Sequence, residues 1–541
     1  MRMTNKIMQN NSLYNINNNK LLRDKLSTQM STQKKITRPS DDPVIAIRAL
    51  RLRTSVSELV QYHEKNVQDA ESWLNVTDKS LSTITDVLTD FNRKANTGAN
   101  KEYNADNLKI ILEQLKSLRD EFYSSGNMDY AGRYIFTGYR TDTPLSFNES
   151  VNKQPEGYPK YVITEQNTIE GFDTVNYTDI GGLSGLSKDN YTEGKYDPTV
   201  AGTGMTEQDI LNGDIHRMRL SYDKLADVNL NMKVMMPNPA DPNGPLVEDT
   251  SVQFAPDKVS YGADPNPYDQ IYAANTANPP EEKVIFVPET GELLFSDASY
   301  SKLENALATN PDGELRFEYT KDQWENGDLR PEHYFACEAT TKNEDGTDKT
   351  VTYNAEYLTT GKNKQTIEYD VGYNQKIQVN TTADEVFTHN LNRDIEDLER
   401  AISDLEKIEA TKKDMEAVYK GMKEGDADYT KVKKQYEAAE KAYSHIRENV
   451  HNMYEKLIGR SQQYLDDTNI AVTDNGTRGQ RLQLIDNRLT EQKTTFKTLQ
   501  SENEDADIAE VAIQLTASEL TYNAALMATG KIMQTSLMNY I

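Results

Sequence analysis

The chain has 541 residues, a formal net charge of -26 and a mean hydropathy of -0.77. This acidic excess argues against a general nucleic-acid binder or a protein held on anionic membranes, because phosphate groups would be repelled over most of the surface. No run of 18 apolar residues occurs, and the first twenty residues lack the apolar segment of a cleaved secretory signal, so we expect neither membrane insertion nor signal-peptide export.

Proline placement divides the chain into helical ends and a different middle. All 18 prolines lie between Pro39 and Pro331. Because proline removes a backbone donor and breaks helix interiors, long helices are expected only in the proline-free stretches 1–38, 44–143 and 332–541.

The first long helix is predicted over about 44–96, which would make it roughly 80 Å long. Apolar or small residues recur there at alternating spacings of three and four, the pattern of a helix packed lengthwise on another helix. A second helix is expected after Asn104. The positions of the first seam are Val67, Ala70, Leu74, Thr77, Leu81, Ile84, Leu88, Phe91 and Ala95.

The same spacing returns in the C-terminal part. Stripes begin at Leu391, Tyr429 and Leu482, and a last one runs from Ala512 to Leu537. The second of these stripes contains Tyr429, Val432, Tyr436, Ala439, Tyr443, Ile446, Val450, Met453 and Leu457. A coiled-coil bundle formed by both ends of the chain is therefore predicted, with Val67, Leu74, Leu81, Ile84, Leu88, Leu482, Ile485 and Leu489 in its seam.

The middle of the chain, about 147–386, is typical of strands and turns. Alternating apolar residues predict hairpins over 284–296 and 334–357, and Cys337 is expected to be buried on a strand. The predicted fold class is therefore α+β, a discontinuous bundle of long helices with an inserted β-rich domain.

The two ends of the chain carry opposite charges. Residues 1–60 contain eleven Lys or Arg and four Asp or Glu, a balance of +7, whereas residues 501–541 contain six acids and one base, a balance of -5. This difference would steer the two ends together, within one chain or between neighbours. Separately solvated charged faces are the alternative.

No pattern of catalytic or ligand-binding residues stands out. The His63–Glu64 pair lacks the second histidine of a zinc motif, and no phosphate-binding loop, nucleophile elbow or calcium loop is complete. We expect no enzyme activity, no metal and no cofactor.

The terminal stripes would leave apolar faces exposed on isolated helices. They must pack on each other or wait for a partner surface, which suits a self-assembling subunit. The expected terminal assembly contacts are Leu21, Leu22, Leu26, Leu515, Tyr522, Leu526, Met533 and Leu537.

Both ends of the chain resemble the flagellin superfamily. QMSTQKKITRPSDDPVIAIRALRLR (29–53) carries the helix-turn signature of that family, and 481–541 resembles its C-terminal region. Asp41 or Asp42 can accept from free backbone N–H groups of the following helix, and Pro43 suits its first position. The signature residues are Pro39, Ser40, Asp41, Asp42 and Pro43.

Within the superfamily the details resemble the hook-associated branch at the hook–filament junction. They lie in 131–147, 377–387 and 530–541. Two departures are a glutamine, Gln33, where a glycine is usual, and helix-like sequence over 408–465 that is longer than the family norm.

The resemblance implies an extracellular subunit of the bacterial flagellum, exported through the flagellar type III pathway. Its implied partners are the preceding hook-associated protein, flagellin, copies of itself in a ring, and an export chaperone. Residues 1–43 and 501–541 would form an inner assembly domain that is disordered in the monomer.

The remaining parts would be a coiled-coil domain, 44–146 with 387–500, and an outer domain of one or two subdomains, 147–386. Two alternative functions stay open. The chain could be a flagellin filament subunit, or a soluble coiled-coil adhesin or scaffold.

Overall fold

The computed structural model describes most of the chain. The described residues are 5–147, 159–180, 182–192, 195–196, 202–238, 244–308, 310, 312–343, 346–360, 364–426 and 428–538. They fall into two compact units. The first contains Met1–Ser72, Glu368–Gln378 and Arg478–Ile541, and the second contains Trp73–Ile367 and Val379–Thr477.

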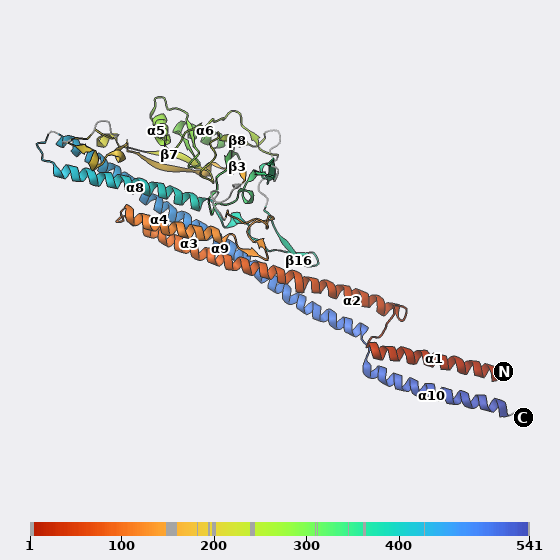
Figure 1. Ribbon diagram of the computed structural model, residues 1–541. Helices are drawn as coiled ribbons and strands as arrows, with labels where there is room; N and C mark the ends of the chain where they lie inside the picture. The colour runs from red at the N-terminus through yellow and green to blue at the C-terminus, as the bar shows by residue number, and fades with distance from the viewer. Residues whose placement is uncertain are drawn as a thin grey trace. The chain divides into compact units, whose positions relative to one another are not determined.

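Long helices occupy both ends of the chain, as the heptad spacing predicts (Figure 1). The N-terminal helices are α1 Asn5–Thr32, α2 Pro43–Gln61, α3 Gln68–Gly98 and α4 Ala105–Ser125. The C-terminal helices are α8 Asn390–Gly421, α9 Tyr429–Glu504 and α10 Ile508–Met538. The 76 residues of α9 correspond to a length of about 110 Å.

The helix predicted over 44–96 contains one irregularity. Residues Tyr62–Val67 form a π-helix, η1, between α2 and α3. Asn66 Nδ2 donates to the carbonyl of Asp370 at 2.7 Å, which ties η1 to a hairpin of β16 Glu368–Gly372 and β17 Gln375–Gln378. The spacing of apolar residues cannot predict a single turn of π-helix, because the seam residue Val67 is buried there as it would be in an α-helix.

Two larger sheets form the middle of the chain. The five-stranded sheet has the order β10 Asp257–Lys258, β11 Val284–Val287, β12 Glu292–Phe295, β7 Leu211–Arg219 and β4 Phe172–Asp179. The six-stranded sheet has the order β15 Asp348–Tyr353, β14 Ala336–Lys342, β3 Lys160–Asn167, β13 Glu314–Lys321, β8 Asn231–Met236 and β9 Val247–Glu248. The hairpins predicted over 284–296 and 334–357 are confirmed as β11–β12 and β14–β15.

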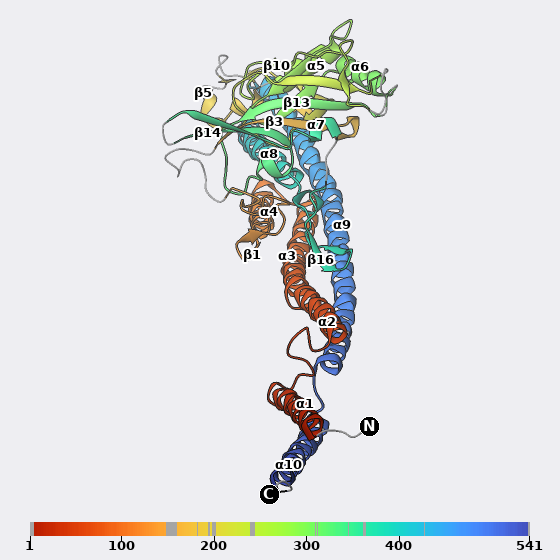
Figure 2. The same ribbon diagram turned by 90° about the vertical axis from the view of Figure 1, so that its right-hand side faces the viewer.

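Smaller elements complete the second unit. They are the strand pairs β1 Asp129–Tyr130 with β2 Arg133–Tyr134 and β5 Tyr191–Thr192 with β6 Lys195–Tyr196, and the helices α5 Pro267–Thr276, α6 Asp297–Ala308 and α7 Tyr357–Thr360. Figure 2 shows α5 and α6 beside the strands of the middle region. The predicted α+β fold class is confirmed.

The main core of the middle region lies between the two sheets. Leu293 and Phe295 of β12 point into this core with Ile163 and Phe317 of the other sheet. Leu294, between them in β12, belongs to a second core under α5. Successive side chains of a strand point to opposite faces, so β12 is apolar throughout because both of its faces are buried. Cys337 of β14 is also buried, as its strand pattern predicts.

Helices of the two chain ends run antiparallel along each other. In the second unit Asn475 Nδ2 of α9 donates to the carbonyl of Leu74 at 3.1 Å, and Asn92 Nδ2 of α3 donates to Ser461 Oγ at 2.8 Å. In the first unit, η1 and α9 are also in contact, because His63 Nε2 lies 3.0 Å from Thr490 Oγ1. The residues expected in the seam are all buried: Val67, Leu74, Leu81, Ile84, Leu88, Leu482, Ile485 and Leu489.

Candidate assembly site

Two helix breaks of the first unit meet side by side. The first break separates α1 from α2, and the second separates α9 from α10. The backbone N–H of Lys35 donates to the carbonyl of Glu504 at 2.7 Å, and the N–H of Ala506 donates to the carbonyl of Gln33 at 2.9 Å. Backbone groups freed by both helix ends are thus satisfied by each other.

Ion pairs reinforce this junction. Glu504 accepts from Arg53 through both carboxylate oxygens, Nε to Oε1 at 2.7 Å and Nη2 to Oε2 at 2.6 Å. Lys34 Nζ lies 2.5 Å from Asp505 Oδ1. The hydrogen bond from Arg53 lowers the pKa of Glu504, and the hydrogen bond from Lys34 lowers the pKa of Asp505. The opposite charges of the two chain ends therefore meet within the chain.

The five signature residues build the turn that leads into α2. Asp42 Oδ1 accepts from the N–H groups of Val44 at 2.9 Å and Ile45 at 3.1 Å, and Pro43 takes the first helical position. Asp41 instead faces backwards and accepts from the N–H of Arg38 at 2.9 Å. Of the two acids considered for the cap, Asp42 serves it.

Gln33 has a left-handed backbone with φ of 58°. This is the region that glycine adopts at little cost and that other residues disfavour by roughly 1–2 kcal/mol. The glutamine noted in the sequence therefore stands at a position where the backbone itself favours glycine.

Helices α1 and α10 lie side by side in both views (Figures 1 and 2). Their shared contact, here called the inner seam, contains Gln9, Ser12, Ile16, Asn19, Arg23 and Leu26 on α1. On α10 it contains Val511, Leu515, Ser518, Tyr522, Ala525 and Thr529. The guanidinium of Arg23 lies 4.9 Å from the ring centroid of Tyr522, a cation–π distance. Four of the six seam residues on α1 are thus polar, so a search for apolar spacing could not have found this seam.

A second apolar stripe runs along α10 on the side opposite the inner seam. This outer stripe contains Ile513, Ala517, Leu520, Ala524 and Met527. Leu520 is 73% exposed, and Ile513 and Met527 are each 71% exposed. Their spacing of four and three residues is that of a helix with another helix lying along it. On α1, Ile7, Tyr14 and Leu21 form a similar exposed stripe at seven-residue spacing.

The predicted assembly contacts are divided between these surfaces. Leu26 is buried and Leu515 and Tyr522 are half-buried in the inner seam. Leu21, Leu22 and Leu526 are exposed. The side chains of Met533 and Leu537 lie outside the described residues, and the role of the whole set in assembly stays a prediction.

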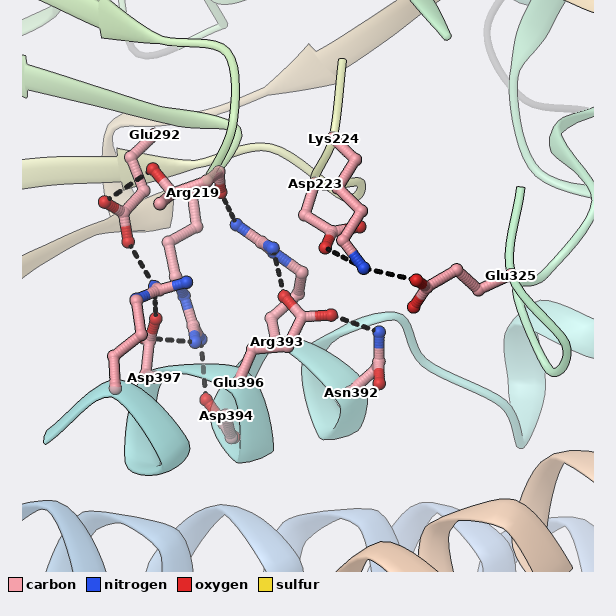
Figure 3. A network of polar contacts seen from close by, with 12 residues as sticks. Arg219, Asp223, Lys224, Glu292, Glu325, Asn392, Arg393, Asp394, Glu396 and Asp397 are labelled. Atoms are coloured by element: carbon pink, nitrogen blue, oxygen red, sulfur yellow. Dashed lines mark hydrogen bonds and ion pairs between the residues drawn. The ribbon is translucent and has the colours of Figure 1, made fainter. Parts of the chain in front are cut away.

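A second polar site lies in the second unit, between α8 and the five-stranded sheet (Figure 3). Arg217 Nη2 donates to Asp397 at 2.9 Å, and Nη1 donates to Glu292 at 2.8 Å. Arg219 Nη2 lies 2.7 Å from Asp394. Burial acts to raise the pKa of Asp397, but Arg217 and Arg219 outweigh it and hold that pKa well below its usual value. These charges are buried but paired, so they can join the sheet to α8.

Sequence reasoning missed this ion-pair network. The sequence shows two arginines on the same face of a strand, Arg217 and Arg219, and two aspartates one helical turn apart on α8. Because the chain contains so many acidic residues, the sequence alone cannot distinguish aspartates that form buried ion pairs from aspartates that face solvent. A cavity of about 660 Å³ lies beside Arg217, between β4 and α9.

Within the described ranges, no cluster of three or more His, Cys, Asp or Glu side chains has the geometry to hold a metal ion. None of the helices that the structure describes combines the length and the apolar character needed to cross a membrane.

The class of protein is indicated first by the N-terminal helices. A family model, the bacterial flagellin N-terminal helical region, matches residues 3–141. This span contains α1 to α4 and the Pro39–Pro43 signature. The resemblance to the flagellin superfamily is confirmed for this part of the chain.

Two individual relatives are both flagellar hook-associated proteins. Flagellar hook-associated protein 3 of Salmonella typhimurium is 29% identical over 143 residues, which are 26% of this chain and 45% of that protein. The same protein of Escherichia coli K12 is 28% identical over 158 residues, which are 29% of this chain and 49% of that protein. The matches thus span about half the length of these relatives, and they confirm the resemblance to the hook-associated branch.

Solved structures of similar proteins align only loosely. A flagellar hook-associated protein from Vibrio parahaemolyticus gives a TM-score of 0.32 at 12% identity, covering 86% of this chain and all of that one. Flagellar hook-associated protein 3 from Legionella pneumophila gives 0.28 at 7% identity, covering 83% of this chain and 97% of that one.

Proposed function

We propose that this chain is a structural subunit of the bacterial flagellum, located outside the cell, that joins the hook to the filament as a ring of identical copies. Two findings support this proposal. The family model matches the N-terminal helices, and the two named relatives are both hook-associated protein 3. The proposed role is mechanical and requires no catalysis.

The observation that carries the proposal is the outer stripe of α10. This helix buries one face and exposes a second apolar face. Leaving apolar surface in contact with water is unfavourable by about 25 cal/mol for each Å². The hairpin of α1 and α10 cannot cover this stripe, because the inner seam already occupies the opposite face. A second copy that brings a similar helix would cover it.

The parts of the chain take different roles in this proposal. Residues 1–43 and 501–541 form the inner assembly domain, whose outer stripe becomes covered when copies meet. Residues 44–146 and 387–500 form the coiled coil that transmits bending and torque. Residues 147–386 form an outer domain.

The proposed partners follow from this role. They are the preceding hook-associated protein on one side, flagellin on the other, and copies of this chain within the ring. An export chaperone would hold the terminal helices before type III export.

Leu520→Asp tests the proposal. The side chain is exposed, so the charge should leave the unfolding midpoint of the soluble chain unchanged. It should abolish assembly, because a buried unpaired carboxylate is strongly unfavourable between packed helices. Filament attachment in cells that carry only the variant is the readout.

The matched control is Asn523→Asp, an exposed residue of α10 that lies on neither the inner seam nor the outer stripe. It adds the same charge and should assemble normally. The proposal fails if both variants attach filaments as well as the unaltered chain does. A large fall in the unfolding midpoint of Leu520→Asp would show instead that the stripe is covered within the monomer.

A further inference from the structure

A buried lysine at the end of β13 lies beside two carboxyl groups. The Nζ atom of Lys321 is 3.5 Å from Oδ1 of Asp223 and 3.6 Å from Oδ2 of Asp328. The lysine side chain has no exposed surface, and the side chains of Asp223 and Asp328 are 13% and 10% exposed. Nζ also donates to the backbone carbonyl of Asp223 at 2.7 Å. One amine and two acids are therefore held together inside the second unit.

Two aromatic rings cover the amine. Nζ of Lys321 lies 5.3 Å from the ring centroid of Trp324 and 5.6 Å from that of Tyr222. Both rings are buried in the main core. Because they keep solvent away from the amine, a condensation that releases water is protected from reversal there.

The two carboxyl groups differ in how readily they hold a proton. Burial raises the pKa of Asp328, and the charge of Lys321 only partly offsets this effect. Burial also acts to raise the pKa of Asp223, but the charges of Lys321 and Arg393 outweigh it and lower that pKa. Asp328 is thus the better proton carrier and Asp223 the better carboxylate. A protonated carboxyl group can be attacked by an amine, and a carboxylate can act as a base.

A backbone donor is fixed on the carboxyl group of Asp328. The N–H of Glu325 donates to its Oδ2 at 2.9 Å. Attack on a carboxyl carbon places negative charge on oxygen, and an N–H already aimed at that oxygen stabilises the charge. The loop is itself anchored, because the N–H of Phe147 donates to the carbonyl of Asp328 at 2.9 Å. A nucleophile, a carboxyl group, a base and an oxyanion donor therefore meet at one place.

We propose that Lys321 forms an intramolecular isopeptide bond with Asp328, and that Asp223 is the general base of this reaction. Asp223 takes one proton from the ammonium group, and the neutral amine attacks Cγ of protonated Asp328. The bond from Nζ to Cγ forms, and the bond from Cγ to the hydroxyl oxygen breaks. The hydroxyl leaves as water with the second proton that the nitrogen loses. The reaction consumes no oxidant, reductant or other reactant.

The bond closes a covalent ring over residues 321–328. Trp324 lies within this ring, and its indole packs on Phe147 and Tyr161 with ring centroids 4.6 Å and 5.2 Å away. The ring therefore fastens the end of β13 to a loop that belongs to the main core. The inference does not depend on the proposed function.

Mass spectrometry of the unaltered full chain tests the proposal. Trypsin normally separates residues 317–321 from 322–342, because it cleaves after Lys321. It does not cleave after a lysine whose amine has become an amide. We expect one peptide, 317–342, that is lighter by one water molecule than its sequence requires. Two peptides of unaltered mass overturn the proposal.

The position of the bond is checked in the same digest. A branched product that joins residues 220–224 to 317–342 would place the bond on Asp223 and overturn the proposal. Lys321→Met keeps an apolar stem beside the aromatic rings but has no amine, so its peptide should keep the full mass. Loss of water in that variant would reveal a cyclic imide instead, and would also overturn the proposal.

Lys224→Met is the matched control. Lys224 is exposed, and its Nζ lies 3.9 Å from Oδ2 of Asp223 (Figure 3). Because this lysine is outside the buried group, its replacement should leave the bond intact. A chain that loses the bond in this variant as completely as in Lys321→Met would overturn the assignment of the nucleophile.

Asp223→Asn tests the base. The amide keeps the shape of the side chain but cannot take the proton, so bond formation should be about a hundredfold slower. The bonded fraction at fixed times after synthesis measures the rate, and circular dichroism checks the fold. An unchanged rate would overturn the role of Asp223. If the variants do not fold, the digest of the unaltered chain still decides whether the bond exists.

Discussion

Arg53 of α2 and Glu504, the last residue of α9, form a bidentate ion pair. The side chain of Glu504 is only 3% exposed. The pair lies at the point where the chain leaves the coiled coil on both sides to form the α1–α10 hairpin. The junction is therefore held by side chains as well as by the backbone bonds of Lys35 and Ala506.

Arg53→Met should weaken this junction. The methionine keeps most of the apolar stem but removes both hydrogen bonds, and an ion pair with one exposed partner contributes about 1 kcal/mol. Native-state hydrogen exchange of the amides at the end of α9 should show that loss as a lower local unfolding free energy. Arg51→Met, exposed on the same helix, should leave it unchanged.

The junction should also loosen in acid. Both Glu504 and Asp505 have a lowered pKa in the folded chain, so their stabilisation is fully present above their ordinary values, 4.5 and 3.8. It is lost as the pH falls through the lowered values, because protonation then removes the charges. Spin labels on Ser27 and Thr516 should report a wider distance distribution at about pH 3 than at about pH 6.

Glu504→Gln removes one of the two titrating groups and serves as the comparison. It should already show a broader distribution at neutral pH and a smaller change on acidification. An identical pH response in both chains would contradict the role given to Glu504.

Gln33→Gly should stabilise the turn after α1. Glycine adopts the observed left-handed backbone without strain, although it gains freedom in the unfolded chain, so a net gain of about 0.5–1 kcal/mol is expected. Gln33→Val should act in the opposite direction, because a β-branched residue disfavours this region most. Chemical denaturation monitored by hydrogen exchange in α1 distinguishes the two, and the same sign for both would refute the backbone argument.

Arg217→Met should destabilise the second unit strongly. It leaves the buried carboxylates of Glu292 and Asp397 with fewer partners, and breaking a buried ion pair costs about 3–5 kcal/mol. Lys349→Met on exposed β15 is the control. Urea unfolding followed by the fluorescence of Trp324, which lies in the main core, measures the change. A loss of stability no larger than that of the control would show that the ion-pair network contributes little.

Glu396, in the same region, should make the stability of the second unit fall as the pH rises, which is opposite to the effect of Glu504 and Asp505. Burial raises its pKa to about 7 from an ordinary 4.5, against the attraction of Arg393. The folded state then holds the proton more tightly, so this group reduces stability as the pH rises from 4.5 to about 7. Glu396→Gln should flatten that part of the curve of urea midpoint against pH, and an unchanged slope would contradict it.

The helices and their seams could be predicted because they depend on one property, the spacing of apolar residues along the chain. A repeat of 3.5 residues places Leu74, Leu81 and Leu88 on one line, and nothing but a partner helix buries such a line. The turn at Asp42 and Pro43 was equally predictable, because capping chemistry is local. The hairpin of β11 and β12 followed from its apolar runs on either side of Gly291.

The remaining features depend on contacts that no local pattern encodes. The α1 side of the inner seam uses Ser12, Asn19 and Arg23, so apolar spacing suggested the outward-facing Leu21 and Leu22 instead. The contacts between α9 and β4 join residues more than 270 positions apart. Such pairs become visible only when the fold brings them together.

Quantitative mass spectrometry of sheared, purified flagella distinguishes a junction ring from a filament subunit. It compares the amount of this chain with that of the most abundant filament protein in the same preparation. If the chain forms a ring between hook and filament, only trace amounts are expected, and they should stay with the hook-containing fraction. Bulk abundance would make the chain a filament subunit, and its absence from flagella would contradict the proposed function altogether.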